Sequence, residues 1–215
     1  DEGRLLLSGD VLLIFDLKKV NFKEEQAGCL AFKESPQYGQ NFGVYVSNKE
    51  GYVEKCLQKK SVEVLKNEGA IDSNDLINID TGAVFFNKEI LDLLYSMIDT
   101  EDKYNEIVND KVRLSLYADL LYPFAIKSTL EKFYEEKPEG EMNDNLLQVR
   151  KILWEKLNKF KMKIFEFDNA KFIHIGNTIE VLDMVNKNYE NYKFLGWGKN
   201  TGCSLVFDKF SGYNS

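Results

Sequence analysis

The stretch Arg4-Leu-Leu-Leu-Ser-Gly-Asp-Val-Leu-Leu-Ile-Phe15 decides the predicted fold, because it is an aliphatic run with one carboxylate near its middle. A strand that is buried on both faces of an open α/β sheet reads as a continuous aliphatic run. Ligands of such sheets collect beyond the carboxyl ends of the strands. We therefore expect a buried strand that carries Asp10 to a ligand-binding edge, with Gly9 relaxing the backbone beside it. The alternative is an ordinary tight turn between two strands, since glycine and aspartate are common turn residues.

The composition describes a globular chain with an acidic balance. At 215 residues the chain is long enough for one large domain or two small ones. Its net charge of -7 argues against a general nucleic-acid or anionic-membrane surface, because both need a clustered excess of lysine and arginine. Three widely spaced cysteines, none of them in a C-x-x-C pair, favour a reducing compartment. No apolar run approaches the roughly 18 residues that span a bilayer, and we see no signal peptide, so we expect a cytoplasmic protein.

Strand patterns alternate with helical patterns along the rest of the chain. Strands are predicted at residues 27–33, 42–46, 52–57, 79–86, 162–167 and 171–176, and helices at 61–69, 87–98, 146–160 and from Asn177 onward, with a mostly helical stretch at 104–136. We expect Asn87 to cap the second helix, and Asn177 and Glu180 to form a capping box at the start of the last one. The apolar stripe of the long helix would comprise Leu146, Val149, Leu153, Leu157 and Phe160. This alternation predicts an α/β sheet with crossovers, and the hairpin at 42–57 makes the sheet mixed. We place one α/β domain at residues 1–190 and a tail at 191–215.

The residue types exclude several kinds of catalytic site. His174 is the only histidine of the sequence and no serine or cysteine occupies a nucleophile elbow, which argues against covalent catalysis. Histidines and cysteines are too few for a structural zinc, and the dinucleotide fingerprint and the Walker A loop are absent. Asp10 and Asp16 stand six residues apart, which is not the Asp-x-Asp pair of haloacid-dehalogenase-type phosphatases. Phosphoryl and nucleotidyl transfer remain, because they need only a metal-binding carboxylate, a cation or two and accurate placement.

Six motifs follow one another in an order that resembles the fucose-1-phosphate guanylyltransferase family. That family includes the GDP-L-fucose pyrophosphorylase half of bifunctional fucokinase/GDP-fucose pyrophosphorylase enzymes. The resemblance runs from about Leu5 to Val185. The motifs are Leu7-Ser-Gly-Asp-Val-Leu12, Asn41-Phe-Gly-Val-Tyr45, Leu57-Gln-Lys-Lys-Ser61, Asp80-Thr-Gly-Ala-Val-Phe-Phe86, Leu114-Ser-Leu-Tyr-Ala-Asp119 and Phe172-Ile-His-Ile-Gly-Asn-Thr178.

The resemblance implies a fold and a reaction. The fold would be the Rossmann-like sugar nucleotidyltransferase domain, usually followed by a left-handed β-helix and, in the bifunctional enzymes, fused to a kinase domain. The reaction would join GTP and L-fucose 1-phosphate to give GDP-L-fucose and pyrophosphate. The sugar phosphate attacks the α-phosphorus in line, so no enzyme nucleophile is needed. The implied cofactor is Mg²⁺, with Mn²⁺ as a substitute.

The resemblance also implies roles for single residues. Asp10 matches the metal-binding Gly-Asp of the family, and Lys59 falls where related enzymes keep a lysine for the sugar phosphate; the alternative for such a lysine is a solvated side chain. His174 stands where many sugar nucleotidyltransferases carry a second metal-binding aspartate, so it would ligate the metal or donate to phosphate. Its alternative is a packed core histidine. The implied substrate-binding residues are Gly9, Asn41, Gly43, Asp80, Thr81, Gly82, Asp119 and Gly176.

Asp119 has its own alternative, which is a plain acid on a helix surface.

Two departures from the family bear on activity. In the family, a Gly-rich NTP-binding loop precedes the segment that corresponds to Ser8-Gly9-Asp10, and we do not find this loop in the sequence. In addition, Lys59 is followed by Lys60, where the family usually has a proline. We therefore expect this chain alone to have little or no transferase activity. The competing function is a catalytically silent relative that binds a nucleotide sugar or serves assembly, and another sugar or base is a third possibility.

Overall fold

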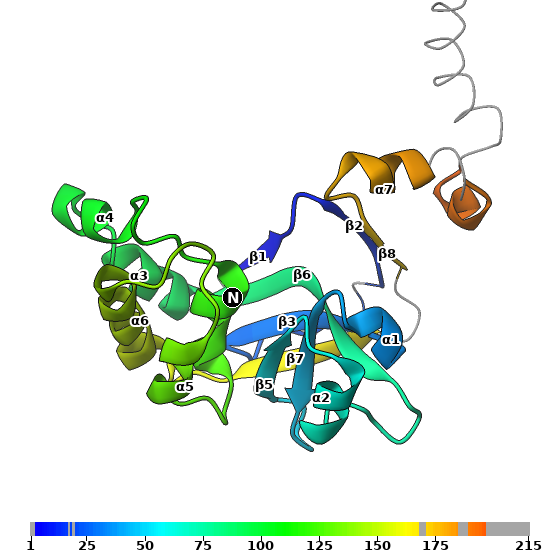
Figure 1. The fold of residues 1–215 in the computed structure, drawn as a ribbon, viewed down its shortest axis with the longest axis horizontal. Helices are drawn as coiled ribbons and strands as arrows, with labels where there is room; N and C mark the ends of the chain where they lie inside the picture. Colours follow the sequence, from blue (N-terminus) through cyan, green and yellow to red (C-terminus); the bar gives the residue numbers. More distant parts are fainter. Residues whose placement is uncertain (1–2, 17, 19, 168–170, 185–188, 197–215) are drawn as a thin grey trace, which may run out of the picture. The chain divides into compact units, whose positions relative to one another are not determined.

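The computed structural model describes residues 3–16, 18, 20–167, 171–184 and 189–196 (Figure 1). The chain divides into two compact units. The first unit holds residues 1–8 and 14–170, and the second holds residues 9–13 and 171–215. The expected tail at 191–215 lies mostly outside the described residues, which end at Gly196.

The first unit is built on a six-stranded mixed sheet, as predicted. Its strands run in the order β5-β4-β6-β3-β7, and β1 pairs with β6 off this path. β3 and β7 pair in parallel, whereas β1, β3 and β4 each pair with β6 in the antiparallel sense. The predicted hairpin is confirmed as the antiparallel pair β4 and β5. The strands are β1 (Gly3–Leu7), β3 (Ala27–Glu34), β4 (Gly43–Ser47), β5 (Val53–Gln58), β6 (Ile77–Asn87) and β7 (Met162–Phe167).

The opening stretch is not one buried strand, so that prediction is wrong. It forms β1 and then β2 (Val11–Ile14), with a turn at Ser8, Gly9 and Asp10 between them, which is the alternative reading. β1 is an edge strand, and its side chains alternate between partly buried and exposed positions, with Leu7 61% exposed. The aliphatic run misled the prediction because the backbone breaks at the turn residues, and the two halves then pair with different strands.

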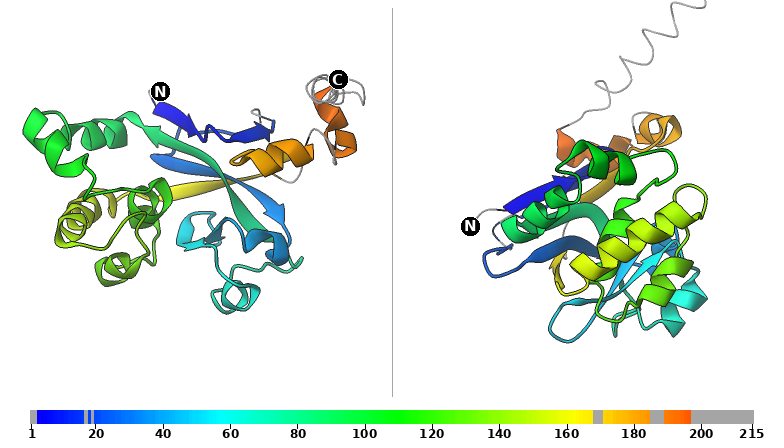
Figure 2. Two further views of the ribbon diagram at one scale, coloured as in Figure 1. Left: turned by 45° about the horizontal axis from the view of Figure 1, so that its top comes forward. Right: turned by 90° about the vertical axis from the view of Figure 1, so that its left-hand side faces the viewer.

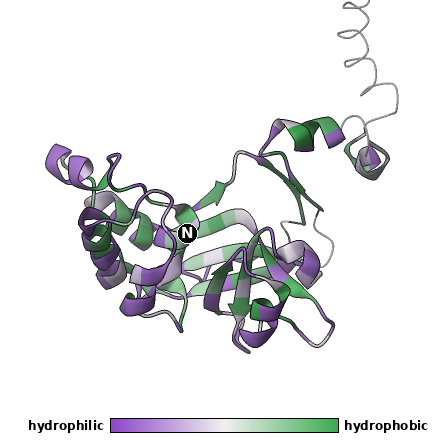
Figure 3. Cartoon of the chain, in the orientation of Figure 1, coloured by the Kyte–Doolittle hydropathy of each residue, from purple (hydrophilic) through white to green (hydrophobic). Residues whose placement is uncertain are grey.

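Helices cover one part of the sheet in the first unit (Figures 1 and 2). The predicted apolar stripe of the long helix is confirmed, since Leu146, Val149, Leu153 and Leu157 are all buried. Figure 3 shows by contrast that α4 is mostly hydrophilic, and Ile107 is its only buried residue. The helices are α1 (Pro36–Gly39), α2 (Val62–Asn67), α3 (Lys88–Ser96), α4 (Glu101–Ile107), η2 (Leu116–Leu121), η3 (Tyr122–Phe124), α5 (Leu130–Glu135) and α6 (Asp144–Leu157).

The stretch at 104–136 is less helical than predicted. It contains the end of α4, the π-helix η2, the short 3-10 helix η3 and α5, with irregular backbone between them. Ser115 caps the start of η2 and Thr129 caps the start of α5, because each side chain accepts a hydrogen bond from a backbone N–H of the following turn. Pro123 then sits in the first turn of η3. Several short helices with their own caps replace one long helix.

The second unit contains a two-stranded sheet of β2 and β8 (Lys171–His174), followed by α7 (Thr178–Leu182) and η5 (Tyr189–Leu195). The Ile175 N–H donates to the Asp10 carbonyl at 2.8 Å, which extends the pairing beyond β8. The predicted capping box is confirmed, because the side chains of Asn177 and Glu180 each accept from the other's backbone N–H. Within the described residues of both units, no helix has the length and apolar character needed to cross a bilayer.

Candidate functional site

Side chains from two neighbouring strands pack closely against Gly43 of β4. Gly43 pairs with Gln58 across β4 and β5, and the pairing of Val44 with Ile79 places Gly43 beside Asp80 of β6. A Cβ atom at position 43 would lie 2.8 Å from Gln58 Nε2 and 3.3 Å from Asp80 Oδ2. The amide of Gln58 and the carboxylate of Asp80 therefore both lie against the glycine, and a side chain at position 43 would displace them.

Asp80 is a buried carboxylate with a shifted pKa. Its residue is only 6% exposed, and burial raises the pKa to about 6. The Gly82 N–H donates to Oδ1 at 2.9 Å and opposes the shift, as do the nearby hydroxyls of Tyr45 and Tyr117. The Tyr45 hydroxyl is buried and lacks a well-formed hydrogen bond within the described residues. A buried carboxylate of this kind is typical of a functional site.

Gly82 brings further polar groups to Asp80. It has a φ of +71°, a left-handed conformation that favours glycine. A Cβ atom here would lie 2.8 Å from Ser8 Cβ and 3.2 Å from the Tyr117 hydroxyl. The Ser8 N–H donates to the Gly82 carbonyl at 3.0 Å, which fixes this approach. We call Ser8, Gly43, Gln58, Asp80, Gly82 and Tyr117 the Asp80 cluster.

Two further predicted substrate-binding residues flank the cluster without joining it. Thr81 is 2% exposed, and its hydroxyl donates to the Leu30 carbonyl of β3 at 2.7 Å, so it serves the sheet. Asn41 is exposed in the turn before β4, where its N–H donates to the Tyr38 carbonyl. The sequence prediction thus names three members of the cluster, Gly43, Asp80 and Gly82, and misses Ser8, Gln58 and Tyr117. All three missed residues lie inside the motifs that carry the family resemblance.

Lys59 has a strained backbone directly after Gln58. It is exposed and has a φ of +48°, which is uncommon for a residue with a side chain. Its N–H donates to the Phe42 carbonyl at 3.1 Å, and this bond holds the left-handed conformation. Such a conformation costs roughly 1–2 kcal/mol and is concentrated at functional sites. Lys59 therefore directly follows Gln58, a member of the Asp80 cluster, in the sequence.

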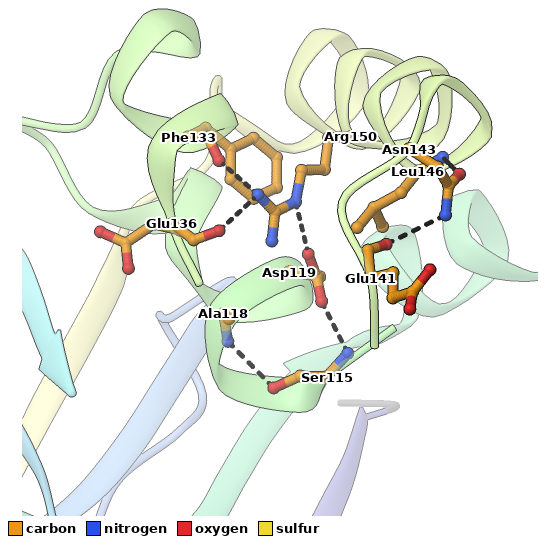
Figure 4. A network of polar contacts seen from close by, with 9 residues as sticks. All are labelled: Ser115, Ala118, Asp119, Phe133, Glu136, Glu141, Asn143, Leu146 and Arg150. Atoms are coloured by element: carbon orange, nitrogen blue, oxygen red, sulfur yellow. Dashed lines mark hydrogen bonds and ion pairs between the residues drawn. The ribbon is translucent and has the colours of Figure 1, made fainter. Parts of the chain in front are cut away.

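Asp119 is buried in a network of polar contacts in the first unit (Figure 4). The surface alternative is wrong, because the Asp119 side chain is 0% exposed. Its Oδ1 accepts from Arg150 Nε at 2.8 Å, and its Oδ2 accepts from the Ser115 N–H at 2.7 Å. Both oxygens are thus engaged inside the protein, and we do not include Asp119 in the Asp80 cluster.

Arg150 is the buried partner that the sequence prediction missed. Its side chain is also 0% exposed, and Nη1 donates at 2.8 Å to the carbonyls of both Phe133 and Glu136. The signal was present in the sequence, because position 150 falls on the apolar stripe of α6 between Leu146 and Leu153. A charge on such a stripe requires a buried partner.

The second unit brings Asp10, His174 and Glu180 together. The Nε2 of His174 lies 3.4 Å from Asp10 Oδ2, and its Nδ1 lies 3.0 Å from Glu180 Oε2. The core-histidine alternative is wrong, since the His174 side chain is 34% exposed and contacts two carboxylates. The hydrogen bond with His174 lowers the pKa of Glu180. The sequence prediction gave Glu180 a capping role only.

Gly9 and Gly176 of this unit differ in their surroundings. A Cβ atom at Gly176 would lie 2.5 Å from His174 Cε1 and 3.2 Å from Asp10 Oδ2, so the imidazole occupies the space of the absent side chain. A Cβ atom at Gly9 would meet nothing within 4 Å. Across the part of the chain that the structure describes, no group of three or more His, Cys, Asp or Glu residues is arranged to hold a metal ion.

An open cavity of about 720 Å³ lies elsewhere in the first unit. None of the predicted site residues lines it. Its charged lining comprises two lysines and three glutamates, a net negative balance that does not suit nucleotide phosphates. We therefore place the candidate site at the Asp80 cluster. The lining residues are Gly3, Val20, Asn21, Phe22, Lys23, Glu24, Glu25, Gln26, Phe85, Asn87, Lys88 and Glu89.

The first unit is thus an α/β domain with a mixed sheet and a buried carboxylate between two glycines. The whole chain belongs to the fucose pyrophosphorylase domain family, whose model matches residues 1–212. This confirms the resemblance inferred from the motifs. A curated relative, the bifunctional fucokinase/GDP-fucose pyrophosphorylase of Arabidopsis thaliana, is 28% identical over 194 residues. That match covers 85% of this chain but only 17% of the relative.

Two solved structures show a more distant likeness. HddC from Yersinia pseudotuberculosis complexed with GMP-PN aligns with a TM-score of 0.44 and 13% identity, over 84% of this chain and 52% of that chain. A second HddC structure from the same organism aligns with a TM-score of 0.45 and 13% identity, over 85% of this chain and 54% of that one. A likeness at this level says nothing about the ligands of this chain.

Proposed function

We propose that this chain is the nucleotidyltransferase part of a sugar-1-phosphate guanylyltransferase, which transfers GMP from GTP to L-fucose 1-phosphate. A phosphate oxygen of the sugar phosphate forms a bond to the α-phosphorus of GTP. The bond from that phosphorus to the β-bridging oxygen breaks, and pyrophosphate leaves with the electron pair. The products are GDP-L-fucose and pyrophosphate. Family membership and the name of the Arabidopsis thaliana relative support this reaction.

The Asp80 cluster is the observation that carries the proposal. A buried carboxylate with a pKa of about 6, a primary amide and a tyrosine hydroxyl lie close to two glycines, where a larger residue would meet neighbouring atoms at 2.8 Å. Carboxylate and amide groups are good partners for sugar hydroxyls because together they accept and donate hydrogen bonds. We therefore assign the sugar to the Asp80 cluster. Lys59 follows Gln58 in the chain, and its exposed ammonium is assigned to the sugar phosphate.

The donors of the second unit fit a magnesium ion that the nucleotide helps to hold. Mg²⁺ is usually bound by one or two carboxylates together with water and substrate phosphates. Asp10 supplies one carboxylate that is 49% exposed, and His174 holds this carboxylate through Nε2 at 3.4 Å. We assign Asp10 as the protein ligand and His174 as its orienting neighbour. Bound there, the ion would neutralise negative charge on a phosphate group, and Mn²⁺ would serve as a substitute.

We also propose the substrates, the compartment and the accompanying domains of the chain. The substrates are GTP and a sugar 1-phosphate, and the setting is the cytoplasm. The name of the Arabidopsis thaliana relative combines a kinase with a pyrophosphorylase, and this chain corresponds to 17% of that protein. We propose that a kinase domain accompanies the chain in the same way, with a β-helix domain as the alternative neighbour.

A catalytically silent domain that binds nucleotide sugar is the second candidate. The observation in its favour is the small donor set around Asp10, since the described residues include no group of three metal-binding side chains. The two candidates differ in their need for metal. A transferase site should bind GDP-L-fucose more tightly with Mg²⁺, whereas a silent binding domain should not depend on it.

Thermal stabilisation of the chain tests the proposal. GDP-L-fucose with Mg²⁺ should raise the melting temperature more than UDP-glucose does, and Asp10→Asn should abolish the Mg²⁺-dependent part. Asp110→Asn is the matched control, because Asp110 is an exposed turn residue of the first unit. Stabilisation that ignores Mg²⁺ would support the silent domain. An identical response to both nucleotide sugars would contradict the proposal.

A further inference from the structure

Tyr117 is the member of the Asp80 cluster that comes from the π-helix η2. Its hydroxyl lies 3.2 Å from the Cβ position of Gly82 and stabilises the charged form of Asp80. Its ring is partly buried against the hydrophobic core. A tyrosine hydroxyl both donates and accepts hydrogen bonds, so it can serve Asp80 and a ligand at the same time.

We propose that Tyr117 is a substrate-binding residue whose hydroxyl bonds to a hydroxyl group of the sugar beside Asp80, and that the buried ion pair of Asp119 and Arg150 fixes it there. This inference rests on the proposed function, because it assigns a residue to the same sugar site. Neither the motifs nor the comparisons give Tyr117 or Arg150 a role.

The backbone that carries Tyr117 has an unusual form. η2 is a π-helix, a rare element that often marks a functional site. Its start is fixed by a reciprocal pair of bonds, because the Ser115 hydroxyl accepts from the Ala118 N–H at 3.2 Å and the Ser115 N–H donates to Asp119 at 2.7 Å. Tyr117 lies between these two bonded positions. Its place over Gly82 is therefore set by the cap and by Asp119.

Arg150 connects this π-helix to two other helices (Figure 4). Its guanidinium bonds to Asp119 of η2 and to the carbonyls of Phe133 and Glu136, at α5 and its C-cap. The ion pair has no exposure to water, so desolvation makes it costly to form. Its Nη2 atom is buried and has no hydrogen bond within the described residues, which adds to that cost. An interaction of this kind is weak evidence for stability and better explained by the specific geometry that it imposes.

Titration calorimetry with GDP-L-fucose and with GDP tests the inference. Tyr117→Phe keeps the ring and should weaken GDP-L-fucose binding about 3- to 10-fold, the range for one neutral hydrogen bond, while GDP binding stays unchanged. Tyr95→Phe is the control, because Tyr95 is 67% exposed on α3 and should change neither affinity. A merely structural role for Tyr117 would weaken both ligands or neither, and either result would overturn the assignment.

Asp119→Asn tests the second half of the inference. It should weaken GDP-L-fucose binding without weakening GDP binding, and adding Tyr117→Phe to it should cost much less than Tyr117→Phe alone. Additive losses would overturn the link between the ion pair and Tyr117. Failure of the unsubstituted chain to prefer GDP-L-fucose over GDP and UDP-glucose would overturn the proposed function instead, and with it the assignment of Tyr117.

Discussion

Replacing Arg150 with methionine should destabilise the first unit by about 3–5 kcal/mol, the usual cost of removing one partner of a buried ion pair. The magnitude follows from the geometry. Asp119 would lose its cationic partner at 0% exposure, with the Ser115 N–H as its remaining hydrogen bond in the network of Figure 4. The carbonyls of Phe133 and Glu136 would also lose a donor at 2.8 Å. Methionine preserves most of the apolar stem, so the loss reports on the polar head.

Urea denaturation followed by tryptophan fluorescence measures this loss where it occurs. Trp154 lies on α6 with its ring 6.2 Å from that of Phe133, so it reports on the surroundings of Arg150. Lys151→Met is the matched control on the same helix. Lys151 and Glu155 are both more than half exposed and 4.0 Å apart, and such a surface pair contributes only about 0–1 kcal/mol.

A double variant separates the uncompensated charge from lost packing. Arg150→Met combined with Asp119→Leu removes both charges and should recover at least about 2 kcal/mol relative to Arg150→Met alone. A loss for Arg150→Met as small as that of Lys151→Met would refute the reasoning. Additive losses in the double variant would do the same, because they would mean that Asp119 is not left with an uncompensated charge.

Three other substitutions have defined outcomes. Burial raises the pKa of Asp80 from 3.8 to about 6, so the folded chain binds more protons than the unfolded chain between these values. The free energy of unfolding should therefore fall by about 3 kcal/mol as pH rises through that window. Asp80→Asn should remove this slope in urea titrations at a series of pH values and should weaken GDP-L-fucose binding. Gly82→Ala should lower the free energy of unfolding by at least about 1 kcal/mol more than Gly69→Ala does in urea denaturation. Both positions have a positive φ, but only position 82 has neighbouring atoms within 4 Å of the added Cβ. Equal losses would contradict the close approach of Ser8. Lys59→Gly should be about 1 kcal/mol more stable than Lys59→Ala in the same assay, because glycine adopts a φ of +48° without strain. Both variants should lose affinity for sugar phosphate. Equal stabilities would argue against the strained backbone.

Local patterns in the sequence predicted the elements that local chemistry controls. The strand at 162–167 matches β7, and the apolar stripe at 146–157 matches α6, because period-2 and period-3.6 patterns reflect which face of one element is buried. The cap of α3 by Asn87 and the capping box of α7 are also confirmed, since a cap depends on residues three positions apart.

Features that depend on long-range contacts were not predictable in the same way. The run from Arg4 to Phe15 looked like one buried strand, but the pairing of its two halves with β6 and β8 is invisible in its composition. Asp119 and Arg150 are 31 residues apart, and the burial of the aspartate follows from the packing of three helices. Asp80 was placed in the site by resemblance, whereas its burial and its pKa come from the sheet around it.

A crystal structure of the chain with GDP-L-fucose and Mg²⁺ tests the central claim most directly. The account predicts that the sugar lies over Gly43 and Gly82, with one of its hydroxyl groups within hydrogen-bond distance of the Asp80 carboxylate. A sugar bound away from Asp80, with no contact to its carboxylate, would contradict it.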